Sequence, residues 1–375
     1  QEEEEEAGDE GKDRGVAGCP KGRAESSRED RPAKRSYTSS SSASSKRKKR
    51  RRKALIRIVR QHDGKLPHVT PNDRNYQEVL SQSFGGFHVL PRSSITEEVH
   101  RKVKSALETL LQHRLFRRDV VRSSSLEPSK LANVKTAGRK AGAFLYTATQ
   151  VRRLLVGNWG LTHIYLNLRL FPIPWDREEH TEGGALQEAL RCMRVLNRIL
   201  VERSNSLSRD PKSPCDYNLI LMNFYDPTEM QGGIQEPYYG MGEMAISWHA
   251  DKMVKKGSAI AVYNLTFPES EDLEAKDPGV GHTVREWKVG CKVQWSTDKG
   301  LLTPLPNGGT YFMLDGFNDR CSHAVMTGSS PRFSTTHRVG VEGENTLAHL
   351  ERLQKEATQI IRGAQGASLG KVRSG

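Results

Sequence analysis

The chain has 375 residues, of which 35% are apolar, and a formal net charge of +13. The positive charge predicts a polyanionic partner, with nucleic acid before an anionic membrane surface. No apolar run approaches the ~20 residues that span a bilayer, so we expect no membrane partner. The five cysteines are scattered and form no CxxC pair, which argues against a zinc ribbon or a disulfide framework.

Residues 1–60 are predicted to form a disordered tail. Almost nothing apolar occurs before Ala54, so this segment cannot bury enough apolar area to offset its loss of conformational entropy. It contains Lys34-Arg35 and, after ten residues of other types, the basic run 46–53. Two basic clusters at this separation are typical of a bipartite nuclear import signal. A nucleic-acid-binding arm or a solvated charge run is the alternative. We therefore expect a nuclear import receptor as a partner and a nuclear location, with the cytoplasm as a second compartment.

Two amphipathic helices are expected ahead of a β-rich region. Ser94 and Glu97 make a capping-box pattern before apolar residues at helical spacing up to Leu110. A second apolar stripe at helical spacing covers 185–201. After Ser213 the sequence changes to short β-rich runs at 217–224, 259–266, 291–296, 310–315 and 333–339. Several short strands separated by turns favour a sandwich or barrel.

A His-x-Asp pair supplies the first candidate for metal chemistry. Residues two apart point to one side of a strand, so His249 and Asp251 could face one point, with His323 as a third ligand. Two histidines and one carboxylate form the facial triad of non-haem Fe(II) oxygenases. The pattern alone is weak because the chain has 12 histidines, and a surface or hydrogen-bonded histidine is the alternative.

A strand near residue 335 strengthens this interpretation. One face has two arginines and two hydroxyl groups, namely Arg332, Ser334, Thr336 and Arg338. The other face has Phe333, Thr335, His337 and Val339. If the charged face points inward it needs an anionic partner, and a dicarboxylate suits a bidentate guanidinium. An exposed edge strand is the alternative. His337 has the opposite parity, which argues against it as the third metal ligand.

The order HxD, His, RxS and a second arginine resembles the AlkB group of dioxygenases. Within that group, five segments are similar to the FTO (fat mass and obesity-associated) family: RRLLVGNWGLTHIYLNLRLFPIPW (152–175), YNLILMNFYDP (217–227), EPYYGMGEMAISWHAD (236–251), TYFMLD (310–315) and SSPRFSTTHRV (329–339). The resemblance implies a mostly β fold with flanking helices, a double-stranded β-helix (jelly-roll) dioxygenase core over 61–340. It also implies that 341–375, with an amphipathic helix from Thr346 to Ile361, is the truncated start of a helical C-terminal domain.

The same resemblance implies Fe(II), 2-oxoglutarate and O₂ as cofactors. The implied catalytic metal ligands are His249, Asp251 and His323. The implied 2-oxoglutarate pocket consists of Asn223, Tyr311, Arg332, Ser334 and Arg338. The implied base pocket consists of Arg153, Tyr165, Leu166, Ile246 and Trp248. In that pocket the aromatic and apolar side chains would sandwich a flipped base while Arg153 donates to its edge. Segment 228–243 is similar to a loop that favours single-stranded substrates.

Three positions depart from the family pattern. HHDE is usual at the metal site, but this chain has Ala250 and Lys252 in HADK, and His163 replaces a usual tyrosine. The favoured function is oxidative demethylation of N6-methyladenosine in single-stranded RNA. Repair of N3-methyl pyrimidines in single-stranded DNA or RNA is the alternative, as is a catalytically weakened nucleic-acid-binding homologue. The block at 152–175 disfavours a protein or small-molecule hydroxylase.

Overall fold

The structure is a computed structural model of the chain. It describes residues 65–117, 120–122, 135–141, 144–148, 151–165, 168–176, 184–230, 234–267, 285–341, 343 and 346–372. The predicted tail over 1–60, with its import signal, lies wholly before these ranges and is not described. Among the described helices, none combines the length and apolar character that crossing a membrane requires.

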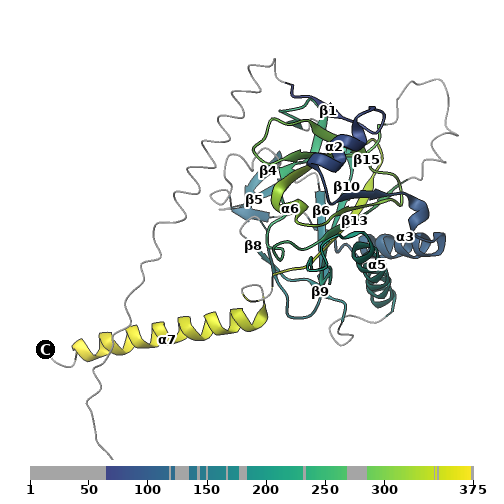
Figure 1. Cartoon of the computed structure of the whole chain (residues 1–375). Helices are drawn as coiled ribbons and strands as arrows, with labels where there is room; N and C mark the ends of the chain where they lie inside the picture. The colour runs from purple at the N-terminus through teal and green to yellow at the C-terminus, as the bar shows by residue number, and fades with distance from the viewer. Residues whose placement is uncertain are drawn as a thin grey trace, which may run out of the picture. The chain divides into compact units, whose positions relative to one another are not determined.

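Two β-sheets form the centre of the fold (Figure 1). The first sheet has the order β2 (Phe87–Leu90), β16 (Thr310–Met313), β13 (Ile260–Thr266), β18 (Arg332–Arg338), β10 (Leu219–Tyr225), β6 (Val151–Gly157) and β9 (Ile173–Pro174). The second sheet has the order β1 (His68–Val69), β15 (Gly300–Pro304), β14 (Lys288–Val293), β17 (Cys321–Met326), β12 (Glu243–His249) and β11 (Ile234–Gln235). Side chains of both sheets share one apolar core, so the sheets face each other.

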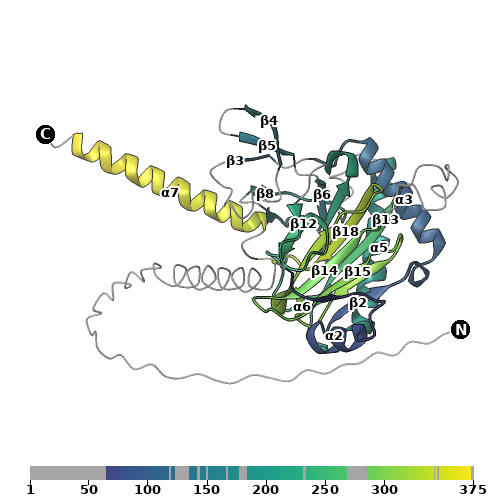
Figure 2. The same cartoon turned by 90° about the horizontal axis from the view of Figure 1, so that it is seen from above.

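The chain order of the central strands defines the architecture. From β10 to β18 the strands pass between the sheets, with β10, β13, β16 and β18 in the first and β12, β14, β15 and β17 in the second. Within each group of four, neighbouring strands are antiparallel. This arrangement is a double-stranded β-helix, so the predicted fold class is confirmed. Figure 2 looks onto the strands of both sheets.

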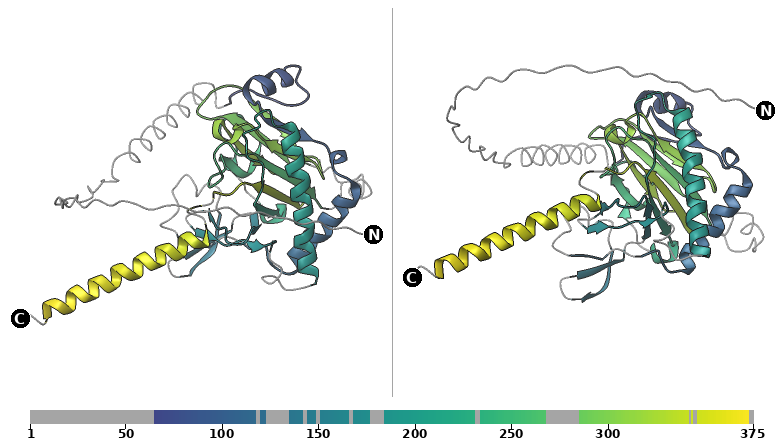
Figure 3. Two further views of the ribbon diagram at one scale, coloured as in Figure 1. Left: turned by 60° about the horizontal axis from the view of Figure 1, so that its bottom comes forward. Right: turned by 90° about the horizontal axis from the view of Figure 1, so that it is seen from below.

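Two long helices cover the outer face of the first sheet, side by side in every view (Figure 3). They are α3 (Glu97–Gln112) and α5 (Ala185–Leu207). The core beneath them takes in the outward side chains of the sheet, including Phe333 of β18 and Val339, which directly follows that strand. Each fully buried aliphatic or aromatic side chain stabilises the fold by about 1.5–3 kcal/mol. The predicted alternation of β18 is therefore confirmed, because its apolar parity packs against helices and its polar parity points between the sheets.

Both predicted helices form, with different ends from those expected. Helix α3 begins after Thr96, and no side chain caps it. The predicted capping box is wrong, because the Glu97 carboxylate instead accepts a hydrogen bond from Arg92 Nε at 2.8 Å. Helix α5 extends past residue 201 to Leu207. Its last turns are held by Ser204, whose hydroxyl lies 2.6 Å from the Tyr217 hydroxyl.

Further elements lie beyond the two main sheets. The remaining helices are α2 (Tyr76–Ser83), α6 (Phe317–Arg320) and α7 (Leu347–Val372). The remaining strands are β3 (Val120–Arg122), β4 (Lys135–Ala141) and β5 (Phe144–Ala148) in one small sheet and β7 (His163–Tyr165) and β8 (Leu168–Leu170) in another. The predicted helix from residue 346 is present as α7, and its start is tied to the core by the Leu347 amide, which donates to the Gly160 carbonyl at 2.8 Å.

Candidate active site

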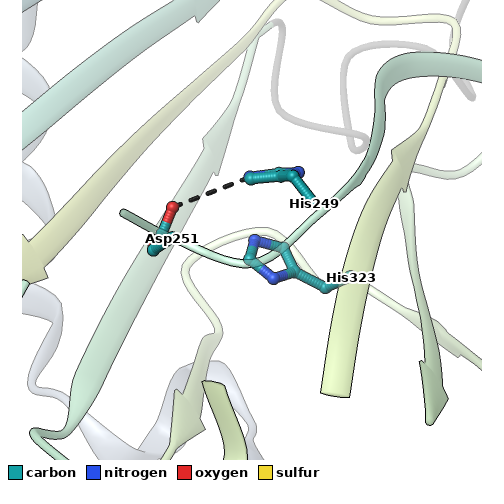
Figure 4. A group of neighbouring side chains, drawn as sticks. All are labelled: His249, Asp251 and His323. Atoms are coloured by element: carbon teal, nitrogen blue, oxygen red, sulfur yellow. Dashed lines mark ion pairs between the residues drawn. The ribbon is translucent and has the colours of Figure 1, made fainter. Parts of the chain in front are cut away.

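Three side chains converge between the sheets at one end of the second sheet (Figure 4). His249 is the last residue of β12, Asp251 follows it by two residues, and His323 pairs with His249 from β17. One ligand atom from each lies within 4.8 Å of the others. The His249 and His323 ring centroids are 4.2 Å apart, and His249 Nε2 lies 3.7 Å from Asp251 Oδ1. The strand ends before Asp251, yet the predicted meeting of these side chains is observed.

Both histidines of the cluster are neutral and available as ligands. The Ser247 carbonyl is 2.8 Å from His249 Nδ1. Because a carbonyl only accepts, Nδ1 carries the proton and Nε2 presents its lone pair to the cluster. Burial lowers the pKa of His249, and burial followed by the nearby His249 lowers the pKa of His323 to about 3. Neutral imidazole is the form that binds a metal ion.

Asp251 is held as a buried carboxylate. Burial by itself would raise its pKa, but the Arg338 guanidinium and then the two cluster histidines lower it below the ordinary value. Arg338 Nη2 donates to Asp251 Oδ1 at 2.8 Å, and the two side chains are 7% and 4% exposed. Among the described residues, Asp251 Oδ2 has no hydrogen-bond partner. This oxygen is thus available to a metal ion.

Asn318 fixes the backbone of Asp251 and was not anticipated from the sequence. The Asp251 amide donates to Asn318 Oδ1 at 2.8 Å, and Asn318 Nδ2 donates to the Asp251 carbonyl at 3.0 Å. This asparagine belongs to the short helix α6, just ahead of the strand that carries His323. No spacing rule relates it to Asp251, because the contact joins segments 67 residues apart.

Arg332 provides a cationic site within the same core. It is 1% exposed, and its guanidinium carbon lies 5.0 Å from the Tyr225 ring centroid and 5.3 Å from that of Trp287. Its Nη2 donates to Asn264 Oδ1. In the described part of the chain, Nε and Nη1 of Arg332 have no hydrogen-bond partner. Two orphaned donors on a buried cation are costly, so the site fits an anionic group such as a carboxylate.

The other residues expected around 2-oxoglutarate lie on the same inner face. Asn223 Nδ2 donates to Ser334 Oγ at 3.3 Å across paired strands. Asn223 Oδ1 lacks a hydrogen-bond partner among the described residues. Tyr311 is 3% exposed, and burial raises its pKa while the charge of Arg332 opposes the rise. The orphaned atoms and the histidine–carboxylate donor set together fit a divalent metal ion with a small dicarboxylate.

The expected base-contacting residues are brought together only in part. Arg153 lies opposite Asn223 in the first sheet, and its charge helps to lower the pKa of His249. Ile246 packs against the core between the sheets. Trp248 lies on the other face of β12, because register shifts occur on both sides of Ile246. Nothing is described of the Tyr165 side chain, and Leu166 lies outside the described residues.

A third histidine lies near the Asp251–Arg338 pair. His163 of β7 is 2% exposed, and Nδ1 has no hydrogen-bond partner among the described residues. Burial, followed by the charge of Arg338, lowers its pKa to about 4, while Asp251 opposes the shift. The position that departs from the family pattern is therefore electrostatically coupled to the metal ligand Asp251.

The fold and the site together define a class of protein. Two histidines and one carboxylate between the sheets of a double-stranded β-helix are the donor set of non-haem Fe(II) oxygenases. Comparison with known proteins narrows the class. The model of the FTO catalytic domain matches residues 74–341. The chain therefore belongs to the FTO catalytic domain family.

One relative and two solved structures are similar to this chain to different extents. The alpha-ketoglutarate-dependent dioxygenase FTO of Xenopus laevis is 29% identical over 338 residues, which cover 80% of this chain and 63% of that protein. The chain thus spans less than two thirds of that relative's length. A prolyl hydroxylase of Trichoplax adhaerens in complex with a hypoxia inducible factor peptide fragment has a TM-score of 0.38 at 11% identity, covering 72% of this chain and 89% of that chain. The structure of OsALKBH1 has a TM-score of 0.32 at 14% identity, covering 68% and 97%.

Proposed function

We propose that this protein is an Fe(II)- and 2-oxoglutarate-dependent dioxygenase that removes methyl groups from bases of single-stranded nucleic acid. The observation that carries the proposal is that one core holds both the His249–Asp251–His323 cluster and the buried Arg332 guanidinium, of which Nε and Nη1 lack hydrogen-bond partners among the described residues. Family membership and the basic net charge of +13 support the choice of a nucleic acid as the substrate.

Each residue of the cluster then has a definite role. His249 and His323 bind the metal through neutral imidazole nitrogens, and Asp251 binds it through a carboxylate that Arg338 keeps ionised. When bound, Fe(II) with 2-oxoglutarate and O₂ supplies the oxidation of an N-methyl group to a hydroxymethyl group, which leaves as formaldehyde. The His249 side chain is 34% exposed whereas that of Asp251 is 4% exposed, so the cluster opens to substrate on the His249 side.

The co-substrate would be held by the inner face of the first sheet. Arg332 binds one carboxylate of 2-oxoglutarate through Nε and Nη1, the atoms that lack partners among the described residues. The Asn223 amide, the Ser334 hydroxyl and the Tyr311 hydroxyl complete the polar lining. Tyr225 and Trp287 cover the Arg332 guanidinium, which excludes water and fixes the orientation of the cation.

We propose that Arg153 recognises the edge of the methylated base, with Ile246 as one apolar wall. Tyr165 and Leu166 belong to this pocket by family resemblance. We favour N6-methyladenine in single-stranded RNA as the substrate. Lys252 supports a second candidate, the N3-methyl pyrimidines, because it replaces the carboxylate that the family motif HHDE presents at this position.

A demethylation assay tests the proposed activity. Single-stranded oligonucleotides that carry N6-methyladenine, N3-methyluracil or N3-methylthymine are incubated with protein, Fe(II), 2-oxoglutarate and O₂, and base mass and formaldehyde are measured. We expect loss of one methyl group, abolished by His249→Ala and retained by His88→Ala, which removes a histidine outside the cluster. Turnover of the pyrimidines alone would establish the second candidate. Failure on every base, with 2-oxoglutarate bound, would contradict the nucleobase assignment.

We also propose nuclear import through the two basic clusters of the tail. A fluorescent fusion of the full chain should accumulate in the nucleus, and substitution of the run 46–53 by alanine should return it to the cytoplasm. Unchanged nuclear accumulation of the substituted protein would refute an import signal at this run.

A further inference from the structure

Lys292 is a buried lysine on the side of the second sheet that faces away from the metal cluster. Along β14, Val289 and Cys291 point into the core between the sheets. Gly290 and Lys292 have the opposite parity, and a Cβ on Gly290 would lie 3.1 Å from the Trp248 ring. Lys292 is 7% exposed, whereas lysine is almost never buried unless it is paired.

The surroundings of the Lys292 amine are aromatic. Nζ lies 5.0 Å from the Tyr238 ring centroid and 5.5 Å from that of Trp248. The negative charge of the Glu236 carboxylate acts on the Lys292 amine and favours its ammonium form. The two Glu236 oxygens already accept hydrogen bonds from the Tyr238 amide at 2.8 Å, the Tyr239 amide at 2.5 Å and the Trp248 indole at 2.7 Å. Within the described ranges, no carboxylate lies within ion-pair distance of Nζ.

This environment disfavours the ammonium form. Burial lowers the pKa of Lys292 to about 8, with Glu236 opposing the shift. A desolvated lysine of this kind has a larger share of free amine at neutral pH and can act as a nucleophile. Because Lys292 is 7% exposed and not fully enclosed, its side chain keeps a small contact with solvent.

We propose that Lys292 is a reactive amine site that takes small aldehydes as imines. The Nζ lone pair forms a bond to the aldehyde carbon, the carbonyl oxygen leaves as water after the amine has given up two protons, and the Nζ=C bond remains. The rings of Tyr238 and Trp248 restrict the space around Nζ, which favours small carbonyl compounds. Formaldehyde belongs to this class and is also the product of the demethylation proposed above, but the inference about Lys292 does not depend on that reaction.

Reductive labelling of the full chain tests the proposal. The protein is treated at pH 7.5 with limiting formaldehyde and cyanoborohydride, which reduces each imine to a stable methylamine, and peptides are quantified by mass spectrometry over time. Lys288 is the matched internal control, because it lies four residues earlier on the same face of β14 and is partly exposed. We expect the initial rate at Lys292 to exceed that at Lys288 by about fivefold or more, as a lowered pKa implies. Equal rates, or a slower rate at Lys292, would overturn the proposal.

Two variants make the result specific to the aromatic surroundings. Lys292→Arg should remove the fast-labelled site and leave the rate at Lys288 unchanged. Tyr238→Leu opens one wall to water and should reduce the ratio of the two rates at least about twofold. A ratio unaffected by Tyr238→Leu, in a variant with the circular dichroism spectrum of the wild-type protein, would show that the aromatic wall does not activate the amine. The ratio of the labelling rates at Lys292 and Lys288 in the wild-type protein tests the proposal even if a variant fails to fold.

Discussion

Replacement of Arg338 by methionine would leave Asp251 as a buried carboxylate without its cation. The two side chains are joined at 2.8 Å and are 7% and 4% exposed. Removal of one partner from a buried ion pair typically costs about 3–5 kcal/mol, because the remaining charge stays desolvated. Since a protonated Asp251 relieves part of this cost, we expect Arg338→Met to lower the free energy of unfolding by about 3 kcal/mol.

Urea unfolding at pH 7.5 in the presence of a chelator measures this change. The double variant Arg338→Met, Asp251→Asn carries no stranded charge, so it should be more stable than the single arginine variant. Arg352→Met is the control, because that arginine is exposed and its contact with Glu356 spans 4.0 Å; its loss should change stability by less than about 0.5 kcal/mol. A free energy of unfolding for Arg338→Met within about 1 kcal/mol of the wild-type value would refute the reasoning. It would also be refuted if the double variant lost as much stability as the two single variants added together.

Three further predictions concern other parts of the structure. Burial lowers the pKa of His337 to about 3, so below pH ~6.5 the unfolded chain takes up a proton that the folded chain excludes, and stability falls by up to about 1.4 kcal/mol per pH unit. In urea unfolding at pH 7, 6 and 5, the stability of His337→Gln should fall less steeply with decreasing pH than that of the wild-type protein. An equal pH dependence in the two proteins would contradict a buried, neutral His337. Gly86→Ala should destabilise by about 2 kcal/mol or more, because φ is +91° and the new Cβ would meet the Leu314 carbonyl at 2.4 Å. Gly85→Ala should cost less than about 1 kcal/mol in the same assay, and equal costs would contradict the strain argument. Lys252→Glu should raise the rate on N6-methyladenine relative to N3-methylthymine, and an unchanged ratio would show that this position does not set the preference.

The sequence predicted β18 well because one physical rule determines it. Strict alternation places Phe333 against the helices and Arg332 between the sheets, and both are observed. The long helices were predictable because each has an apolar stripe at helical spacing, and such a stripe must be buried. The His249, Asp251 and His323 set followed from the chemistry of the donors combined with family resemblance.

Other features depend on contacts that no local pattern encodes. Trp248 and Ile246 lie on opposite faces of β12 because a register shift falls between Ile246 and His249, and a one-residue shift moves a side chain to the opposite face. Asn318 was missed because its bonds to Asp251 join distant segments. Tyr225, Trp287 and Asn264 surround Arg332 only after the sheets have paired. The start of a further helical domain at 341–375 and the tail at 1–60 stay predictions.

Calorimetric titration of 2-oxoglutarate into the protein, under anaerobic conditions with and without Fe(II), tests the central claim most directly. The account predicts metal-dependent binding of one equivalent, weakened at least about tenfold by Arg332→Leu, because the buried guanidinium holds one carboxylate. Binding should lose its metal dependence in His249→Ala and keep it in His88→Ala. Binding that is indifferent to both Arg332 and the metal would contradict the assignment of this site.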